Sequence, residues 1–175
     1  MALNTQRHRK PISDEPNKFL VECLDIINPK PGILALDLPC GFGRHSRLLA
    51  AHGVSVVAAD LHMASLKASK SMAIHSVALD ASHGMPFRPD VFDLIVVVDY
   101  SQEGLISFIK SNLSRNGFII YSTYQGRGGN WVGLPRRSSF LQEISDGFES
   151  IILRLKDVGP GKEERVSVCF LGKRV

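Results

Sequence analysis

The sequence contains only three cysteines, Cys23, Cys40 and Cys169, and they stand far apart. An odd number of widely spaced cysteines does not suit a disulfide framework, and it lacks the close pairs that bind zinc through thiolates. The six histidines show neither the H-x-x-x-H nor the H-E-x-x-H spacing of helical metal ligands. We therefore expect reduced thiols and no metal site.

Long apolar runs are missing as well. No stretch approaches the roughly 18 apolar residues of a membrane span. The polar, basic segment 1–18 has no apolar centre of the kind found in a secretory signal. These absences predict a cytoplasmic protein without a transmembrane segment. The pattern G-x-S-x-G is also absent, which argues against a serine hydrolase of the α/β type.

The chain's 175 residues, 44% of them hydrophobic, suit one domain (1–175) with a buried core. Within it, residues 1–12 are expected to form a basic, flexible leader. The net charge of +4 comes partly from the terminal clusters 7–10 and 172–175. We expect these clusters to be solvated, with contact to phosphates as the alternative.

Short apolar runs alternate with helical patterns, which predicts a parallel sheet. The predicted strands are 32–38, 54–60, 74–80, 92–100 and 118–124. The predicted helices are 13–28, 44–52 and 62–72, together with one that Ser101 caps and that carries Leu105, Ile109 and Leu113. Residues 114–117 are predicted to form a turn, and the glycine-rich segment 125–137 a loop over a site. A helix over 138–148 and strands over 149–158 and 165–173 complete the prediction.

The stretch LDLPCGFGR (36–44) joins a predicted strand to a predicted helix. Gly41 and Gly43 allow the backbone to approach a ligand closely, and the start of the helix offers unpaired N–H groups. In the G-x-G-x-x-G loop of dinucleotide enzymes, a glycine would stand where Ser46 stands here. An NAD-dependent oxidoreductase is therefore disfavoured, but it stays an alternative.

Acidic residues end three consecutive predicted strands, at Asp37, Asp60 and Asp80. Asp60 follows Gly43 at close to the roughly 20-residue distance at which an acid binds ribose hydroxyls. Asp80 stands where a carboxylate can accept from an exocyclic amine. Three carboxylates disfavour a pyrophosphate and suit a ligand with a sulfonium, an ammonium, a ribose and an adenine. S-adenosylmethionine has all four groups.

Over about residues 15–173, the order of these motifs resembles that of the class I S-adenosylmethionine-dependent methyltransferases. LDLPCGFGR is similar to the family's cofactor loop, VVAAD (56–60) to its ribose-binding acid, VALDAS (77–82) to its adenine segment and FDLIVVVDY (92–100) to its fourth strand. The segment LSRNGFIIYSTY (113–124) and the last two strands also match. Among subfamilies, the compact chain looks most like the small tellurite-resistance-type or thiopurine-type members.

The resemblance implies a three-layer, Rossmann-like α/β fold with a mostly parallel seven-stranded sheet and an antiparallel last strand. It also implies S-adenosylmethionine as the cofactor. Pro39, Ser46 and Asn116 depart from the family pattern, because the family has glycines at the first two positions and a proline at the third.

The implied cofactor-binding residues follow the first four strands, and Phe87 is expected to cover the adenine face. They are Asp37, Pro39, Cys40, Gly41, Gly43, Asp60, Leu61, Asp80, Ala81, Phe87 and Asp99.

The residues expected to act on the acceptor follow the fourth and fifth strands. Asp99 and Tyr100 are predicted to be catalytic, by orienting a nucleophile or facing the sulfonium, although Asp99 as a helix cap is the alternative. Tyr124, Arg127 and Trp131 are predicted to line the acceptor pocket, with structural packing as the alternative for Tyr124. Arg44 is a candidate for the cofactor carboxylate and His45 a candidate base, although solvent-facing positions are the favoured interpretation for both.

We predict a small-molecule acceptor that is polar or that reacts through a thiol, an oxyanion or an oxygen. The chain has little length for a domain that reads a macromolecule, and only 125–137 and the first helix offer a lid. The dipeptide at 99–100 is not the N/D-P-P-Y/F tetrapeptide of enzymes that methylate base amino groups or amides. The alternatives are a non-catalytic cofactor-binding or regulatory protein, and an RNA or protein methyltransferase, which the basic termini suggest.

Overall fold

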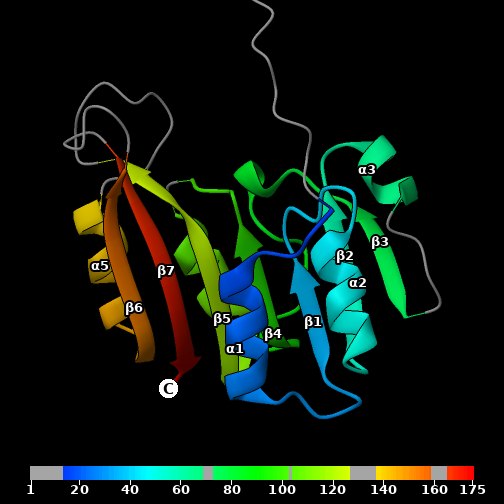
Figure 1. Cartoon of the computed structure of the whole chain (residues 1–175), viewed down its shortest axis with the longest axis horizontal. Helices are drawn as coiled ribbons and strands as arrows, with labels where there is room; N and C mark the ends of the chain where they lie inside the picture. Colours follow the sequence, from blue (N-terminus) through cyan, green and yellow to red (C-terminus); the bar gives the residue numbers. More distant parts are fainter. Residues whose placement is uncertain (1–13, 69–72, 103, 127–136, 159–164) are drawn as a thin grey trace, which may run out of the picture.

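A seven-stranded sheet forms the centre of the molecule, in the strand order β3-β2-β1-β4-β5-β7-β6 (Figure 1). The computed structural model describes residues 14–68, 73–102, 104–126, 137–158 and 165–175. The strands are β1 (Leu34–Asp37), β2 (Ser55–Asp60), β3 (Ile74–Ala78), β4 (Phe92–Val98), β5 (Leu113–Gly126), β6 (Phe148–Val158) and β7 (Arg165–Arg174). Neighbouring strands from β3 to β5 are parallel, whereas β7 is antiparallel to both β5 and β6. The predicted α/β sheet with an antiparallel last strand is confirmed.

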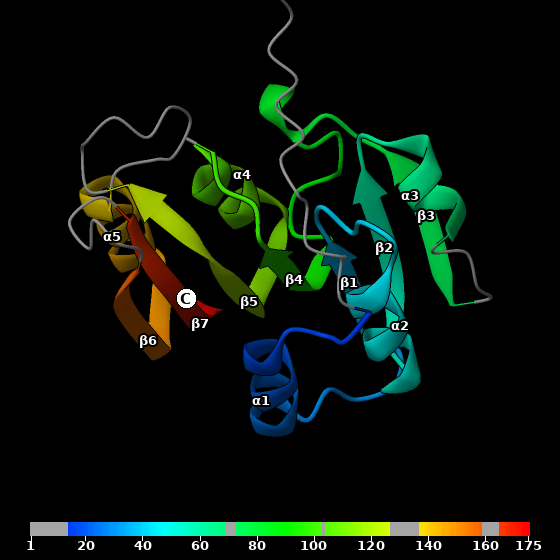
Figure 2. The ribbon, with the colours of Figure 1, turned by 45° about the horizontal axis from the view of Figure 1, so that its top comes forward.

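Helices cover both faces of this sheet. They are α1 (Lys18–Ile27), α2 (Arg44–Ala51), α3 (Met63–Ala68), α4 (Leu105–Asn112) and α5 (Arg137–Ser145), with a short 3₁₀ helix, η1 (Ala81–His83), after β3. Figure 2 shows α1 and α2 on one side and α4 and α5 on the other. Successive side chains of a strand point to opposite faces, so Leu94 and Val96 of β4 pack in the core under α1 and α2, and Ile95 and Val97 in the core under α4 and α5. The result is the predicted arrangement of three layers.

Two predicted helix starts are wrong. The helix predicted over 13–28 begins at Lys18, because Asn17 caps α1: its Oδ1 accepts hydrogen bonds from the N–H groups of Phe19 and Leu20. Ser13 lies outside the described residues. Gly104, rather than Ser101, precedes α4, and the hydroxyl of Ser101 instead accepts a hydrogen bond from Tyr121.

The boundary between α4 and β5 also differs from the prediction. Leu113 begins β5 instead of ending the helix, and the predicted turn at 114–117 belongs to the strand. The register between β4 and β5 shifts here, between Phe92 and Leu94, and Asn116 has a φ of 64°. The polar residues and the glycine of this segment therefore form an irregularity within β5 rather than a turn. The prediction failed because turns and strand irregularities contain the same types of residue.

The strands β1 to β5 all point the same way, so their carboxyl ends meet at one edge of the sheet, at the top of Figure 1. Open α/β sheets bind ligands at this edge. Of the loop predicted over 125–137, residues 125–126 belong to β5, Arg137 begins α5, and 127–136 lie outside the described residues, as do residues 159–164 between the last two strands. None of the described helices has the length and apolar character needed to cross a membrane.

Candidate functional site

In the loop between β1 and α2, the main chain at Gly41 borders a cavity without an intervening side chain. Gly41 and Gly43 have φ values of 50° and 80°, in the left-handed region that favours glycine. Gly41 lines a cavity of about 530 Å³, together with Pro39 and Cys40. A Cβ added to Gly41 would meet no protein atom within 4 Å, so it would occupy space that a ligand can use. The loop thus allows a ligand to lie directly against the main chain.

Asp60, at the end of β2, holds this loop in place. Its Oδ2 accepts a hydrogen bond from the N–H of Gly41 at 2.9 Å, and its Oδ1 accepts one from the N–H of His62 at 2.8 Å. Asp60 lines the 530 Å³ cavity and also a second cavity of about 260 Å³. Each carboxylate oxygen can accept a further hydrogen bond. A ligand that spans both cavities would therefore pass this carboxylate, as predicted for a ribose.

The second cavity has largely apolar walls. Leu61, Ala81 and Tyr100 line it, and the side chain of Leu61 is 60% exposed. The hydroxyl of Tyr100 donates to Gln102, whose Nε2 donates to the carbonyl of Ala81 at 2.7 Å. These bonds fix Tyr100 beside the end of β3. The structure therefore places Tyr100, a predicted catalytic residue, in the same cavity as Asp80 and Ala81.

Asp80 stands at the rim of the second cavity. Its Oδ1 accepts from the N–H of Ser82 at 3.0 Å and from the hydroxyl of Ser82 at 2.6 Å. The hydrogen bonds from Ser82 hold the pKa of this exposed carboxyl below its usual range. An ionised carboxylate beside apolar walls suits a flat heteroaromatic group with an exocyclic amine.

Asp37 lies beneath the loop and is not among the residues that line these two cavities. Its side chain is buried, and its Oδ2 accepts from the hydroxyl of Ser46 at 2.5 Å. Within the described residues, Oδ1 has no hydrogen-bond partner. Burial raises the pKa of Asp37 to about 7. The structure thus places Asp37 as a support for the start of α2.

His45 is buried as well, which excludes the solvent-facing position. Its Nε2 accepts from Nε of Arg44 at 3.1 Å and from the N–H of Asn17 at 3.2 Å. Burial and, to a lesser extent, the charge of Arg44 lower the pKa of His45 to about 4. A ring with an occupied lone pair and so low a pKa does not suit the predicted role of a base. His45 instead connects α1 to α2.

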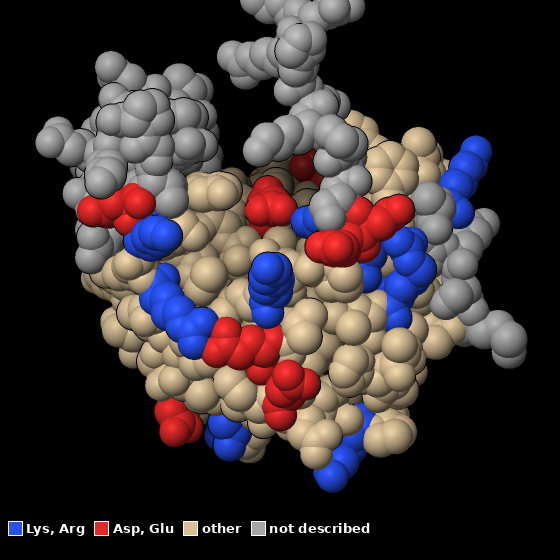
Figure 3. All heavy atoms as spheres, in the orientation of Figure 1, with Lys and Arg blue, Asp and Glu red and all other residues tan. Residues whose placement is uncertain are grey.

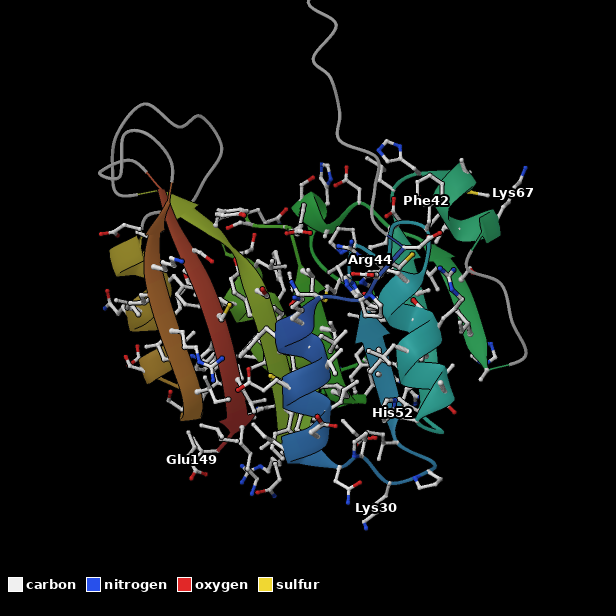
Figure 4. All side chains as sticks on the ribbon, in the orientation of Figure 1. Lys30, Phe42, Arg44, His52, Lys67 and Glu149 are labelled. Carbon is white, nitrogen blue, oxygen red and sulfur yellow. The ribbon has the colours of Figure 1, made fainter. Side chains whose placement is uncertain are left out.

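Asp99, directly after β4, has a φ of 57°, which is uncommon for a residue other than glycine. Its N–H donates to the carbonyl of Ser122 at 2.9 Å, and its Oδ2 lies 3.1 Å from Nη2 of Arg44. Figure 4 shows Arg44 directed toward the centre of the sheet above α1, whereas Phe42 lies higher on the loop, beside α3. Asp99 does not cap α4, because Gly104 precedes that helix. Backbone conformations of this kind are concentrated at functional sites.

A third cavity, of about 330 Å³, lies on the other side of Asp99. The start of α1, the end of β5 and the start of β7 form it. Tyr124 lines it as predicted, and Asp99 is the one residue that it shares with the 530 Å³ cavity. Arg127 and Trp131, the other predicted acceptor residues, lie outside the described residues. Figure 3 shows acidic side chains gathered along the upper edge of this face, above α1 and α2.

The sequence prediction missed most residues of the third cavity. They come from three separated segments and include Asn17, Lys18, Ser122, Ser167 and Cys169. The available signal was the change from apolar to hydroxyl-bearing residues at the end of the predicted fifth strand. Ser167 gave no such signal, because it joins the site only through the antiparallel pairing of β7 with β5.

Phe87 lies elsewhere. Its ring packs edge to face on Phe92, with 5.0 Å between the ring centroids. Phe92 begins β4, and the cavities lie beyond the other end of that strand. This position does not fit the predicted cover over adenine.

Residues 35–116 match a family model described as a methyltransferase domain. No curated protein matches the chain. Geranyl diphosphate C-methyltransferase from Streptomyces coelicolor A3(2), solved with S-adenosyl-L-homocysteine, is 14% identical, with a TM-score of 0.72 over 89% of this chain and 78% of that one. A putative S-adenosylmethionine-dependent methyltransferase from Listeria monocytogenes is 16% identical, with a TM-score of 0.70 over 90% and 97%.

The cyclase SpnF is 11% identical to the chain, with a TM-score of 0.73 over 94% of this chain and 85% of that one. Identities this low show a shared fold. Because one of these proteins is named a cyclase, the fold by itself does not fix the reaction.

Proposed function

Because the chain belongs to the class I S-adenosylmethionine-dependent methyltransferases, we propose that it transfers the methyl group of this cofactor to a small molecule. The observation that carries the proposal is the position of Asp60 in the wall of two adjoining cavities. One cavity has apolar walls and a carboxylate at its rim, and the other has a glycine loop and Asp99. This arrangement suits a ligand with a flat base at one end, a polyol in the middle and a cationic group at the other end.

Different residues of the chain would contact the adenine, the ribose and the methionyl part of the cofactor. Leu61, Ala81 and Tyr100 would hold the adenine, and Asp60 would accept hydrogen bonds from the ribose through its remaining lone pairs. The main chain at Gly41 would border the methionyl part. When bound, S-adenosylmethionine would supply a methyl group on a sulfonium; the acceptor's lone pair would form the bond to the methyl carbon, and the electrons of the methyl–sulfur bond would stay on sulfur.

Methyl transfer places few demands on side chains, because its barrier falls mainly through positioning and exclusion of water. Asp99 is suited to hold an acceptor, since it borders both the cofactor cavity and the third cavity. The third cavity, at about 330 Å³, has the size of a small-molecule site. A small-molecule acceptor and a cytoplasmic location are the parts of the prediction that we carry forward as proposals.

Calorimetric titration with S-adenosylhomocysteine tests the cofactor site. We expect saturable binding, no binding of NAD, and affinity about 10- to 100-fold weaker in Asp60→Ala, because a charged hydrogen-bond acceptor is lost. Asp25→Ala is the matched control, since Asp25 is an exposed carboxylate on α1 that lines none of the three cavities. Circular dichroism verifies that each variant is folded. A folded protein that does not bind S-adenosylhomocysteine would contradict the proposal.

A further inference from the structure

The third cavity is lined in part by Lys18, an exposed residue whose positive charge its own helix does not explain. Lys18 is the first residue of α1, and the first turn of that helix contains no acidic residue. A cation is unfavourable here, because the amino end of a helix is the positive end of its dipole. Local conflicts of this kind are expected at functional positions.

Glu22, which could neutralise the charge of Lys18, forms hydrogen bonds with another residue. Glu22 follows Lys18 by four positions, the spacing at which ion pairs form along a helix. Its two carboxylate oxygens instead accept from Arg154 of β6, at 2.5 and 2.7 Å. Within the part of the chain that the structure describes, no ion pair involves Lys18. Its ammonium is therefore available to a ligand in the cavity.

Hydroxyl groups line the same cavity. Ser122 and Tyr124 of β5 pair in register with Cys169 and Ser167 of β7. The side chain of Ser122 faces α1, because its Oγ accepts a hydrogen bond from Asn17 at 3.3 Å. Hydroxyl donors beside an ammonium are the groups that bind a carboxylate. The lining of the cavity therefore includes groups that suit an anion.

The same cavity also holds an opposite charge, that of Asp99. Asp99 accepts from Arg44 through Oδ2, whereas no hydrogen bond or ion pair with another described residue involves its Oδ1. A carboxylate with an open oxygen favours a ligand amine. Since Asp99 also borders the cofactor cavity, a group held by Asp99 lies at the boundary between the two cavities.

We propose that the third cavity binds a small amino acid, with the carboxylate at Lys18 and the amine at Asp99, and that the amine nitrogen is the methyl acceptor. The proposal rests on the proposed function. The amine first loses one proton to water; its lone pair then forms the bond to the methyl carbon, and the electrons of the methyl–sulfur bond stay on sulfur. The aliphatic amine replaces the thiol, oxyanion or oxygen predicted from sequence, since the missing tetrapeptide concerns base amino groups and amides.

Titrations of the protein saturated with S-adenosylhomocysteine test this site. The probes are glycine, β-alanine and 4-aminobutyrate, with propylamine and propionate as counterparts that carry one charge. At least one amino acid should bind about tenfold more tightly than either counterpart. Lys18→Ala should weaken its binding about tenfold while leaving propylamine unchanged, and Asp99→Asn should weaken the binding of both amines. Lys30→Ala is the control, because Lys30 is exposed at the opposite end of the molecule (Figure 4).

Two results would overturn the amino-acid site. One is equal binding of the amino acids and their singly charged counterparts, or no binding of any probe. The other is unchanged affinity in Lys18→Ala. Binding of S-adenosylhomocysteine, measured in the same samples, separates the two proposals. If it binds and the amino acids do not, only the acceptor site is refuted, whereas failure of S-adenosylhomocysteine to bind refutes the proposed function itself.

Discussion

Two buried residues near the loop give the stability of the protein opposite dependences on pH. Asp37 has a pKa of about 7 in the folded protein against 3.8 ordinarily, so the folded state binds more protons between these values. Its contribution to the free energy of unfolding therefore falls as pH rises from about 4 to about 7. His45, with a pKa of about 4 against 6.5, makes that free energy fall as pH drops from 6.5 to 4. Over most of this range the two effects oppose each other.

Asp37→Asn should reveal the contribution of His45. Without the carboxyl, the free energy of unfolding of the variant should rise from pH 4 to 6.5. Relative to that of the wild type, it should increase as pH increases. The gain should level off above pH 7 at no more than about 4 kcal/mol, the equivalent of a pKa shift of about three. Urea unfolding at about pH 5 and about pH 8 measures the difference. Identical pH profiles for the two proteins would show that the pKa of Asp37 does not differ between the folded and the unfolded state.

Single residues could be predicted where their role follows from chain position. Gly41, Asp60 and Asp80 stand at strand ends, and the carboxyl ends of parallel strands meet at one edge whatever the rest of the chain does. His45 and Phe87 could not be placed in this way. The burial of His45 depends on contact with Asn17, and the position of Phe87 depends on packing against Phe92.

Among the elements, α1 contributes most to the architecture of the site. Its cap, Asn17, accepts from the first turn of the helix, donates its backbone N–H to His45 and donates its side-chain amide to Ser122. The helix is thereby connected to α2 and to β5 through one residue. Sequence patterns predicted a helix here, but they did not identify this cap, because serine and asparagine cap helices equally well and several candidates precede the helix.

Replacement of Asn17 should separate its two roles. Asn17→Ala should lower the free energy of unfolding by roughly 1 kcal/mol, because the cap is lost. Asn17→Ser should keep most of the stability, since serine also caps helices, but it loses the amide that reaches Ser122. Denaturant unfolding measures the first effect. Equal destabilisation by both substitutions would mean that the contact with Ser122, rather than the cap, carries the energy.

In the whole molecule, the residues that match the family model line the cofactor cavities, and residues outside that match line most of the third cavity. Residues 35–116 contain the lining of the two cofactor cavities, with Asp14 as the exception. Apart from Asp99, the third cavity is lined entirely by residues outside that range, from α1, β5 and β7. The part of the chain that resembles other methyltransferases therefore forms the cofactor site, and the remainder forms the proposed acceptor site. This division explains why sequence patterns predicted the first site better than the second.

The cofactor cavities gather residues that follow four different strands, so they exist only in the folded protein. A ligand that binds them must stabilise the fold by mass action, by about 2.7 kcal/mol at a free concentration of 100 Kd. For a chain of 175 residues, this corresponds to a rise in Tm of roughly 5–10 °C. S-adenosylhomocysteine should produce that rise in the wild type and in Asp25→Ala, and a much smaller one in Asp60→Ala. An equal rise in Asp60→Ala would mean that the ligand binds away from the junction of the two cavities, since only there does Asp60 border both of them.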